Sequence, residues 1–452
     1  MPGDHQPHPS PSPTSPAPPV AYLPPQSLLD TLFANQQMWL LRLATGDTTP
    51  PSTHPLVWRA PGVTAARTGH SGVICLDRPT ADLPALLDAC AWLRGTGSGD
   101  VLTWSATPRP ELDLPLLAHG FDLSFQPHWM VRGLPAYVPR LVEEPGIDIH
   151  LARLNDFHAL RATDAIPYVS ADQFPAMQRL IRAPVRVRHV WMLVARESGV
   201  AHHPGVLGQA IVNLSDGPAG RFAGLYNLGV HAGHRKQGIG TALTIAACNL
   251  ARDLRATHIG LNATPAGRSI YRNLGFDEAG AGQTWFLAGR RLATPPDPAT
   301  VRLALATAEG TLPSLAPAEI PRHLANGETP LTFAARLDRA DSVRWLLAHG
   351  APPEILPLWT VGLRDEALAL MRDPAAVNAR IAPQGTTPLH EAVQRDDRVL
   401  AKHLIFAGAD LALTDDRYRA QPSGVARALD RDEIAAMIEV ATAGDTPSAH
   451  VR

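Results

Sequence analysis

The stretch LYNLGVHAGHRKQGIGT, residues 225–241, decides the fold of the middle of this chain. Its first six residues are mostly apolar and predict a buried strand. The run that follows Gly240, TALTIAACNLARDL, has the apolar spacing of a helix. A strand, a glycine-containing turn and a helix start, in that order, make an anion site. The reason is that the first amides of a helix point outward without partners and lie at the positive end of its dipole.

The residues of this turn suit a phosphate group. Gly238 and Gly240 have no side chain to keep an anion away from the backbone amides, and Arg235 can add charge-assisted hydrogen bonds. The pattern RxxGxG is weak when taken alone, because glycine-rich turns precede many helices.

A second stretch, HIGLNATPAGRSIYRNLGF at residues 258–276, strengthens the interpretation. It predicts a strand ending near Asn262, a short helix that contains Tyr271, and a Gly-Phe turn. Together the two stretches resemble the GNAT superfamily of N-acetyltransferases. Arg235, Gly238 and Gly240 match the pyrophosphate loop of that family, and Asn262, Tyr271, Gly275 and Phe276 match its second half.

The resemblance implies an α/β (α+β) fold with a mixed, splayed sheet and acetyl-CoA as the acyl donor cosubstrate, without a metal. The pantetheine arm is expected between the strands at 225–230 and 258–262. The cofactor-binding residues implied are Leu228, Val230, Arg235, Lys236, Gln237, Gly238, Gly240, Thr241 and Asn262. Tyr271 matches the general acid, and a phenol can donate a proton while it stays neutral at pH 7. The structural alternatives are a core role for Tyr271 and a strand-end role for Asn262.

The general base is open. Many relatives carry a glutamate on the strand before the loop, whereas LYNLGV holds no carboxylate. Asn227 could orient a water, and His231 could titrate near neutral pH. A water chain or an already neutral amine would make a dedicated base unnecessary. His202 and His203 share a polar turn without a third ligand nearby, so a metal site is not expected there.

Composition excludes several classes of protein. The chain has 452 residues and a formal net charge of −2, with no long basic run, so neither nucleic acid nor a membrane surface is an expected partner. Its three cysteines, Cys75, Cys90 and Cys248, are far apart, which argues against disulfides or zinc and favours the cytoplasm. No apolar run approaches the ~20 residues that span a bilayer.

Proline-rich breaks divide the chain. Ten of the first 25 residues are proline, so residues 1–26 are expected to form a disordered tail. The expected domains are a degenerate GNAT-like domain at 27–140, the acetyltransferase domain at 145–292 and a repeat domain at 298–442.

The first domain ends like the second. VLTWSAT, PLLAHGF and HWMVRGL in the first block parallel HIGLNAT, IYRNLGF and TWFLAG in the second. This suggests a tandem GNAT protein whose first half lacks an RxxGxG loop and has Leu116 or Leu117 in place of Tyr271. We interpret this half as a non-catalytic companion; an unrelated small α/β domain is the alternative.

The C-terminal block repeats a helical unit. TPLTFAARLDRADSVRWLLAHGA at 329–351 parallels TPLHEAVQRDDRVLAKHLIFAGA at 387–409. Threonine caps a helix start, proline fills its first turn, and Gly350 or Gly408 can end the second helix in a left-handed conformation. The pattern resembles ankyrin repeats. That resemblance implies an all-α stack that presents a surface to a protein partner.

Two functions follow from these resemblances. One is acetyl transfer to an amine acceptor, either a protein or a small molecule, with the ankyrin repeats mediating protein interaction. The other is a non-catalytic acyl-CoA sensor whose output is the ankyrin stack. The acceptor, the ankyrin partner and the oligomeric state carry no sequence signal.

Overall fold

The computed structural model describes residues 25–444, except for 78–81, 135–145, 162–165, 169–170, 199–204, 218–219, 265–266, 313–319, 321, 382–384 and 417–418. Nearly all of the expected N-terminal tail therefore lies outside the described residues, as do His202 and His203. The chain forms two compact units. Unit 1 comprises residues up to 81, 103–108 and 125–284, and unit 2 comprises 82–102, 109–124 and 285–452.

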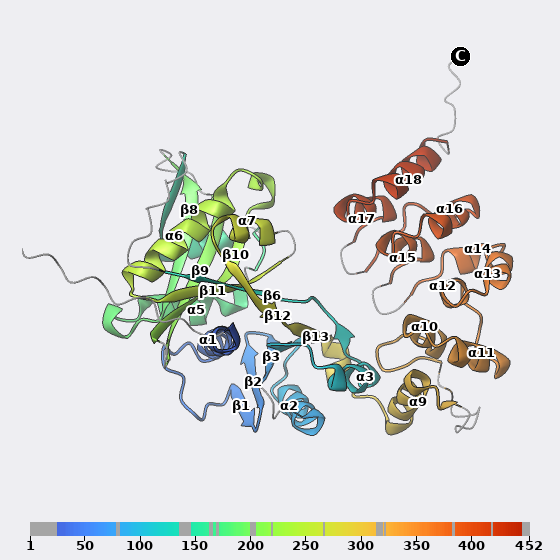
Figure 1. The fold of residues 1–452 in the computed structure, drawn as a ribbon, viewed down its shortest axis with the longest axis horizontal. Coiled ribbons are helices and arrows are strands. Elements are labelled where there is room, and N and C mark those ends of the chain that lie inside the picture. Colours follow the sequence, from blue (N-terminus) through green and yellow to red (C-terminus); the bar gives the residue numbers. More distant parts are fainter. Residues whose placement is uncertain are drawn as a thin grey trace, which may run out of the picture. The chain divides into compact units, whose positions relative to one another are not determined.

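The described residues between 25 and 133 form three helices and six strands (Figure 1). They are α1 (Pro25–Thr45), β1 (Val57–Ala60), β2 (Val63–Thr68), β3 (Ser71–Leu76), α2 (Leu83–Gly95), β4 (Val101–Ser105), α3 (Pro110–Ala118), β5 (Asp122–Leu123) and β6 (His128–Gly133). The side chain of Asp82 caps α2 by accepting a hydrogen bond from the amide of Ala85, and Pro84 occupies its first turn.

The acetyltransferase-like half follows from Ile147. Its elements are β7 (Ile147–Leu151), α4 (Leu154–Arg161), α5 (Phe174–Arg182), β8 (Val190–Glu197), β9 (Gly208–Gly217), β10 (Gly220–Val230), α6 (Ile239–Asp253), β11 (His258–Ala263), α7 (Arg268–Asn273), β12 (Asp277–Ala281), β13 (Gln283–Leu287) and α8 (Gly289–Ala293). Short 3₁₀ turns lie at Ala171–Gln173, Val185–Val187 and Ala232–His234.

Seven strands form a mixed sheet in the order β12-β6-β11-β10-β9-β8-β7. The pair β10–β11 is parallel, and the pairs β7–β8, β8–β9, β9–β10, β11–β6 and β12–β6 are antiparallel. The expected α/β fold with a mixed sheet is confirmed.

The two halves exchange their last strands. A six-stranded sheet has the order β1-β2-β3-β4-β13-β5, so β13 of the second half lies between β4 and β5 of the first. Conversely, β6 of the first half lies between β11 and β12, with Trp129 opposite Asn262 and Val131 opposite Gly260. The repeated strand–helix–Gly-Phe–strand pattern is therefore real, but each closing strand completes the other half's sheet.

Apolar side chains bury both faces of the seven-stranded sheet. On one face, α6 contributes Ile239, Leu243, Ala247 and Cys248 to a core that includes Leu225 and Leu261. The other face packs against α1, α4 and α5 through Trp39, Leu43, Phe157, Phe174 and Leu180. At about 1.5–3 kcal/mol for each large side chain removed from water, these two layers dominate the stability of the sheet.

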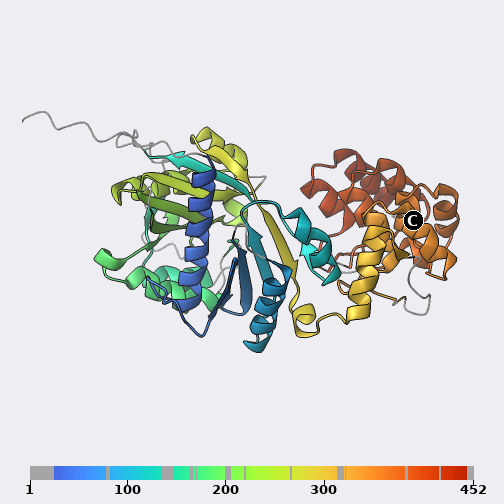
Figure 2. The same ribbon diagram turned by 60° about the horizontal axis from the view of Figure 1, so that its bottom comes forward.

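A buried polar network fixes α1 to the back of this sheet, across which the helix runs (Figure 2). Asn35 is fully buried, and its amide donates to the carbonyl of Asn213 at 3.2 Å and to the Ser215 hydroxyl at 2.7 Å. Its side-chain oxygen accepts from the Tyr226 hydroxyl at 2.7 Å. Each buried polar group here therefore has a partner, which makes the register of α1 on β9 and β10 specific.

The C-terminal part of unit 2 is a stack of helices. They are α9 (Pro298–Glu309), α10 (Pro330–Arg336), α11 (Ala340–Ala348), α12 (Ile355–Thr360), α13 (Arg364–Leu370), α14 (Pro374–Val377), α15 (Pro388–Gln394), α16 (Arg398–Phe406), α17 (Pro422–Ala428) and α18 (Asp432–Gly444). The expected all-α stack is confirmed.

The TPL motifs act in this stack as the sequence predicts. Thr329 and Thr387 cap α10 and α15, and Gly350 and Gly408 have φ angles of 90° and 85°. The buried His390 accepts from the Thr387 amide through Nδ1, and its Nε2 lies 3.0 Å from the carbonyl of Ala420. This histidine therefore joins one repeat to the loop of the next.

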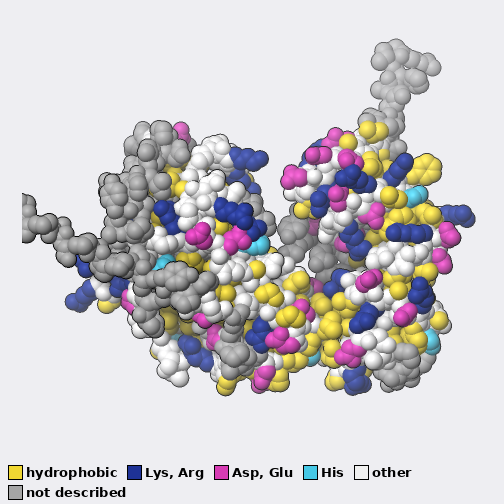
Figure 3. Space-filling model, viewed as in Figure 1, with side chains coloured by type: hydrophobic (Ala, Val, Ile, Leu, Met, Phe, Trp, Pro, Cys, Tyr) yellow, Lys and Arg dark blue, Asp and Glu magenta, His cyan; other side chains and the backbone are white. Residues whose placement is uncertain are grey.

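None of the described helices is long and apolar enough to span a bilayer. On the face shown in Figure 3, basic and acidic side chains are interspersed, so this face presents no continuous basic surface.

Candidate active site

The strands β10 and β11 separate where the sequence predicted the cofactor arm to lie. Their parallel pairing runs from Phe222 opposite His258 to Leu225 opposite Leu261, and there it ends. The remaining residues of β10, including Leu228 and Val230, continue without β11 as a partner. Asn262 is the first residue of β11 beyond the paired region, so it lies at the inner end of this gap.

A β-bulge accompanies the separation. Tyr226 lies opposite Ile211 and Gly229 lies opposite Gln209, so two residues of β10 face one residue of β9. Asn227, the first of the two, has a left-handed φ of 49°. A bulge adds local twist and bends its strand, and this bend accounts for the departure of β10 from β11.

The predicted phosphate loop lies directly before α6. Gly238 caps the helix with a left-handed φ of 79°, and Lys236 has a φ of 62°. These two turns bring the chain into the helix with the amides at its start unpaired. A Cβ on Gly240 would lie 3.7 Å from a methyl group of Val230 and 3.9 Å from one of Leu228, so the helix start faces the splayed end of β10.

The side chains of the loop leave its surface open to a ligand. Arg235, Lys236 and Gln237 are exposed, and neither Arg235 nor Lys236 has an ion-pair partner among the described residues. Thr241, in the first turn of α6, is half-buried. The helix dipole and two unpaired cations thus converge on one turn, an arrangement suited to a diphosphate.

Tyr271 lies on the short helix α7, which follows β11 in the chain. Its ring packs edge-on against Phe276 with centroids 5.8 Å apart, and it also covers Gly267, where a Cβ would lie 3.1 Å from the ring. Burial, and secondarily the nearby phenol of Tyr168, raises the pKa of Tyr271 to about 12. The phenol therefore stays protonated at neutral pH and is available as a donor.

Two arginines fix α7 to the sheet. Arg268 and Arg272 both donate to the carboxylate of Glu278 on β12, with 2.8 Å between Arg268 Nε and Glu278 Oε1. These hydrogen bonds, that of Arg268 first, hold the pKa of Glu278 below its usual value. The Glu278 carboxylate is thus engaged in positioning the helix.

A segment that the sequence did not single out, Ile166–Tyr168, lies over the bulge. The carbonyl oxygen of Pro167 would be 2.4 Å from a Cβ on Gly229. The carbonyl of Tyr168 accepts long hydrogen bonds from Asn227 Nδ2 at 3.4 Å and Gln209 Nε2 at 3.5 Å. Tyr168 has a left-handed φ of 65°, and its side chain is 57% exposed. Its phenol contributes, after burial, to the raised pKa of Tyr271.

The structure gives different hydrogen-bond partners to Asn227 and His231, the two residues that the sequence offered as a general base. His231 Nδ1 accepts a hydrogen bond from the Gly233 amide at 3.2 Å, so a neutral His231 carries its proton on Nε2 and offers no free lone pair. His234 Nδ1 lies 3.1 Å from the same atom; if it shares that lone pair as a second donor, the Nε2 lone pair of His234 is free. Asn227 donates to Tyr168, so its amide positions the loop.

No cluster of three or more metal-ligating side chains occurs within the described residues. Cys75, Cys90 and Cys248 are buried and unpaired, and burial raises the pKa of Cys248 to about 11. The thiol of Cys248 is a packing group in the core beneath α6.

Comparison with known proteins supports the two resemblances. The sequence model of the acetyltransferase (GNAT) domain matches residues 188–278, and that of ankyrin repeats (3 copies) matches residues 303–415. No curated protein matches the chain.

Among solved structures, a GCN5-related N-acetyltransferase from Kribbella flavida is 15% identical with a TM-score of 0.39, covering 59% of this chain and 98% of its own. A tandem GNAT protein from the clavulanic acid biosynthesis pathway is 13% identical with a TM-score of 0.37, covering 57% and 95%. A predicted acetyltransferase with acetyl-CoA from Clostridium acetobutylicum is 18% identical with a TM-score of 0.23, covering 29% and 90%.

The matched range 188–278 contains the splayed strands, the loop before α6 and Tyr271, and the range 303–415 contains both TPL repeats. The two sheets are consistent with a tandem arrangement. The chain thus contains a GNAT acetyltransferase domain, and ankyrin repeats follow that domain.

Proposed function

We propose that this protein transfers an acetyl group from acetyl-CoA to an amine. One observation carries the proposal: the pairing of β10 and β11 stops at Leu225 and Leu261, and the residues of β10 beyond that point lie beside Gly240 at the start of α6. The gap provides exposed strand backbone for an extended arm, and the helix start provides amides for a diphosphate. Both parts are needed for a coenzyme A thioester, and they lie next to each other.

The residues of the chain would divide the work as follows. Arg235, Lys236, Gln237 and the amides from Gly238 to Thr241 would hold the diphosphate, while Leu228, Val230 and Asn262 would border the arm. When bound, acetyl-CoA supplies the activated acyl group. Tyr271 would give its phenolic proton to the departing sulfur, because burial keeps that phenol neutral.

The acceptor would enter beside Tyr168. The contact between Pro167 and Gly229 holds this loop over the bulge, on the same strand that borders the arm. No carboxylate lies on the splayed part of β10. The amine would therefore arrive neutral or lose its proton through water, and the free Nε2 of His234 is the imidazole atom able to receive it.

A second function is favoured by that missing carboxylate. The domain could hold acyl-CoA without turnover and report it through the ankyrin repeats, which in other proteins serve protein interaction. The deciding experiment is an acetyl-transfer screen over small amines and peptides, with release of free thiol as the readout. Amine-dependent thiol release supports the enzyme, whereas tight acetyl-CoA binding without any such release supports the sensor.

A further inference from the structure

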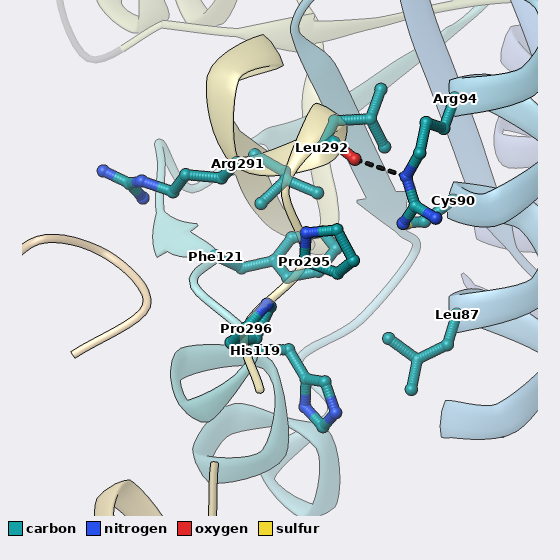
Figure 4. Close-up of a pocket in the computed structure, with 10 residues that line it drawn as sticks. Leu87, Cys90, Arg94, His119, Phe121, Arg291, Leu292, Pro295 and Pro296 are labelled. Atoms are coloured by element: carbon teal, nitrogen blue, oxygen red, sulfur yellow. Dashed lines mark hydrogen bonds between the residues drawn. The ribbon is translucent and has the colours of Figure 1, made fainter. Parts of the chain in front are cut away.

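A cavity of about 160 Å³ lies in unit 2 (Figure 4). One wall is a face of α2, because Leu87, Cys90 and Arg94 recur at a spacing of three and four residues. The other walls are the end of α3 with His119 and Phe121, and the segment from Leu287 to Pro296. Neither resemblance assigns a role to this cavity.

The cavity has the size of a small ring. An apolar protein cavity of about 150 Å³ is large enough to hold benzene. Most of the lining is apolar: Leu87, Cys90, Phe121, Leu287, Leu292, Pro295 and Pro296. Burial raises the pKa of the Cys90 thiol to about 12, so this thiol is a neutral part of the wall.

The charged groups of the lining are unbalanced. The lining holds two arginines, Arg94 and Arg291, and the histidine His119, but no carboxylate. Arg291 is neutralised, because it donates to Asp122 at 2.9 Å and to the carbonyl of Gly120 at 2.6 Å. His119 is not an anionic group either. Its Nδ1 lies 2.7 Å from the carbonyl oxygen of Pro115 and donates a hydrogen bond to it.

Arg94 is the remaining charge, and it is held in place. Its Nε donates to the carbonyl of Leu292 at 2.6 Å, and Figure 4 shows the guanidinium between Leu292 and the side of the cavity formed by Leu87. Its two terminal nitrogens have no acceptor among the described residues. An arginine fixed at one nitrogen with its other donors free is prepared to bind a planar anion.

We infer that this cavity binds a small monocarboxylate with an apolar body, such as an aromatic acid, whose carboxylate pairs with Arg94. Its ring would lie among Leu87, Phe121 and Pro295. Such a ligand would touch the Leu287–Pro296 segment, which connects β13 to the first helix of the repeat region, α9. The site is independent of the acetyl-transfer proposal, since it shares no residue with the splayed strands or the loop before α6.

Calorimetric titration of the full chain with benzoate tests the inference. Saturable binding is expected, with at least about tenfold weaker binding of benzyl alcohol, which has the ring without the charge. Arg94→Gln should weaken benzoate binding about tenfold or more, whereas Arg290→Gln, on the exposed neighbouring turn, should not. Leu87→Trp should abolish binding by filling the cavity.

Three outcomes would overturn the inference. The first is an absence of saturation up to about 10 mM benzoate. The second is an unchanged benzoate affinity in Arg94→Gln. The third is an equal loss of benzoate affinity in Arg94→Gln and Arg290→Gln, which would indicate a general charge effect. Arg94 is exposed, so its variant is expected to fold. If Leu87→Trp does not fold, the benzoate affinities of Arg94→Gln and Arg290→Gln and the affinity for benzyl alcohol still test whether Arg94 binds the carboxylate.

Discussion

The carbonyl oxygen of Pro167 lies so close to Gly229 that a Cβ on this glycine would be 2.4 Å from it. A methyl group of Ile166 would be 3.1 Å from the same Cβ. The absence of a side chain at Gly229 is therefore what allows the 166–168 segment to lie on β10. This contact holds the segment that contains Tyr168 against β10, next to the bulge at Asn227.

The first prediction tests that contact. Gly229→Ala should push the segment off the strand and lower kcat/KM for the amine about tenfold or more, because small misplacements of an acceptor are costly. Acetyl-CoA affinity, measured by calorimetry, should change little. Gly133→Ala is the control, since a Cβ there meets open space. An unchanged kcat/KM in Gly229→Ala would remove this segment from the acceptor side.

The second prediction concerns Tyr271. Tyr271→Phe keeps the ring against Phe276 and Gly267 but removes the proton, and should lower kcat about 10²–10⁴-fold with little change in acetyl-CoA affinity. Equal turnover in the variant and the wild type would return Tyr271 to a packing role.

The raised pKa of Tyr271 adds a pH test to the same variant. The group must be protonated to act as an acid, and its pKa of about 12 keeps it protonated through neutral and moderately alkaline pH. Activity should therefore rise with pH as the acceptor amine loses its proton, without an alkaline fall that depends on Tyr271. A decline centred near the ordinary tyrosine pKa of about 10, present in the wild type and missing in Tyr271→Phe, would contradict this.

The third prediction concerns the loop before α6. A side chain at Gly240 would point toward Leu228 and Val230 at ordinary contact distances, so the variant should fold. Gly240→Val should nevertheless weaken acetyl-CoA binding by about 2–4 kcal/mol, because it blocks the amides at the helix start. Gly240→Ala should lose less. Unchanged affinity in a folded Gly240→Val would exclude this turn as the diphosphate site.

Local sequence patterns predicted most of these elements, whereas contacts between residues far apart in the sequence determine the rest. The loop at Arg235–Thr241, the helix after it and the TPL caps depend on neighbours in sequence, so they could be read directly. The strand exchange could not be predicted, because β6 and β13 carry similar apolar patterns and either strand could occupy either position in the two sheets. The role of Ile166–Tyr168 was also hidden. Its only signal is Gly229, whose meaning requires knowing what lies above it.

The fourth prediction concerns the network at α1. Asn35→Leu should destabilise the protein by about 2–4 kcal/mol, because it leaves the Tyr226 hydroxyl and the side chain of Asn213 buried with fewer partners. Chemical unfolding measures the change. Ala34→Ser, on the neighbouring exposed position of the helix, should have little effect. Equal stability of the two variants would mean that α1 does not depend on this network.

The fifth prediction concerns which fragments can fold. Residues 145–292 contain every residue proposed for acetyl transfer, but they lack β6, the strand between β11 and β12. Trp129 and Met130 on that strand are fully buried. The isolated fragment should therefore aggregate or fail to bind acetyl-CoA. A soluble fragment that binds normally would mean that β13 returns to the gap in place of β6.

A fragment of residues 25–312 should behave differently. It keeps both exchanged strands, and it keeps α9, which packs against α3 of the first half. A cut at Pro296 would instead remove α9 and expose that side of α3, so ending the fragment after Leu312 is the better design. This fragment should be soluble and bind acetyl-CoA as the full chain does.

If the acceptor is a small amine, the turnover of this fragment should also be unchanged. If the acceptor is a protein held by the ankyrin repeats, kcat/KM should fall while thioester hydrolysis without acceptor stays constant. A fragment that folds but no longer binds acetyl-CoA would contradict the separation of the cofactor site from the repeats.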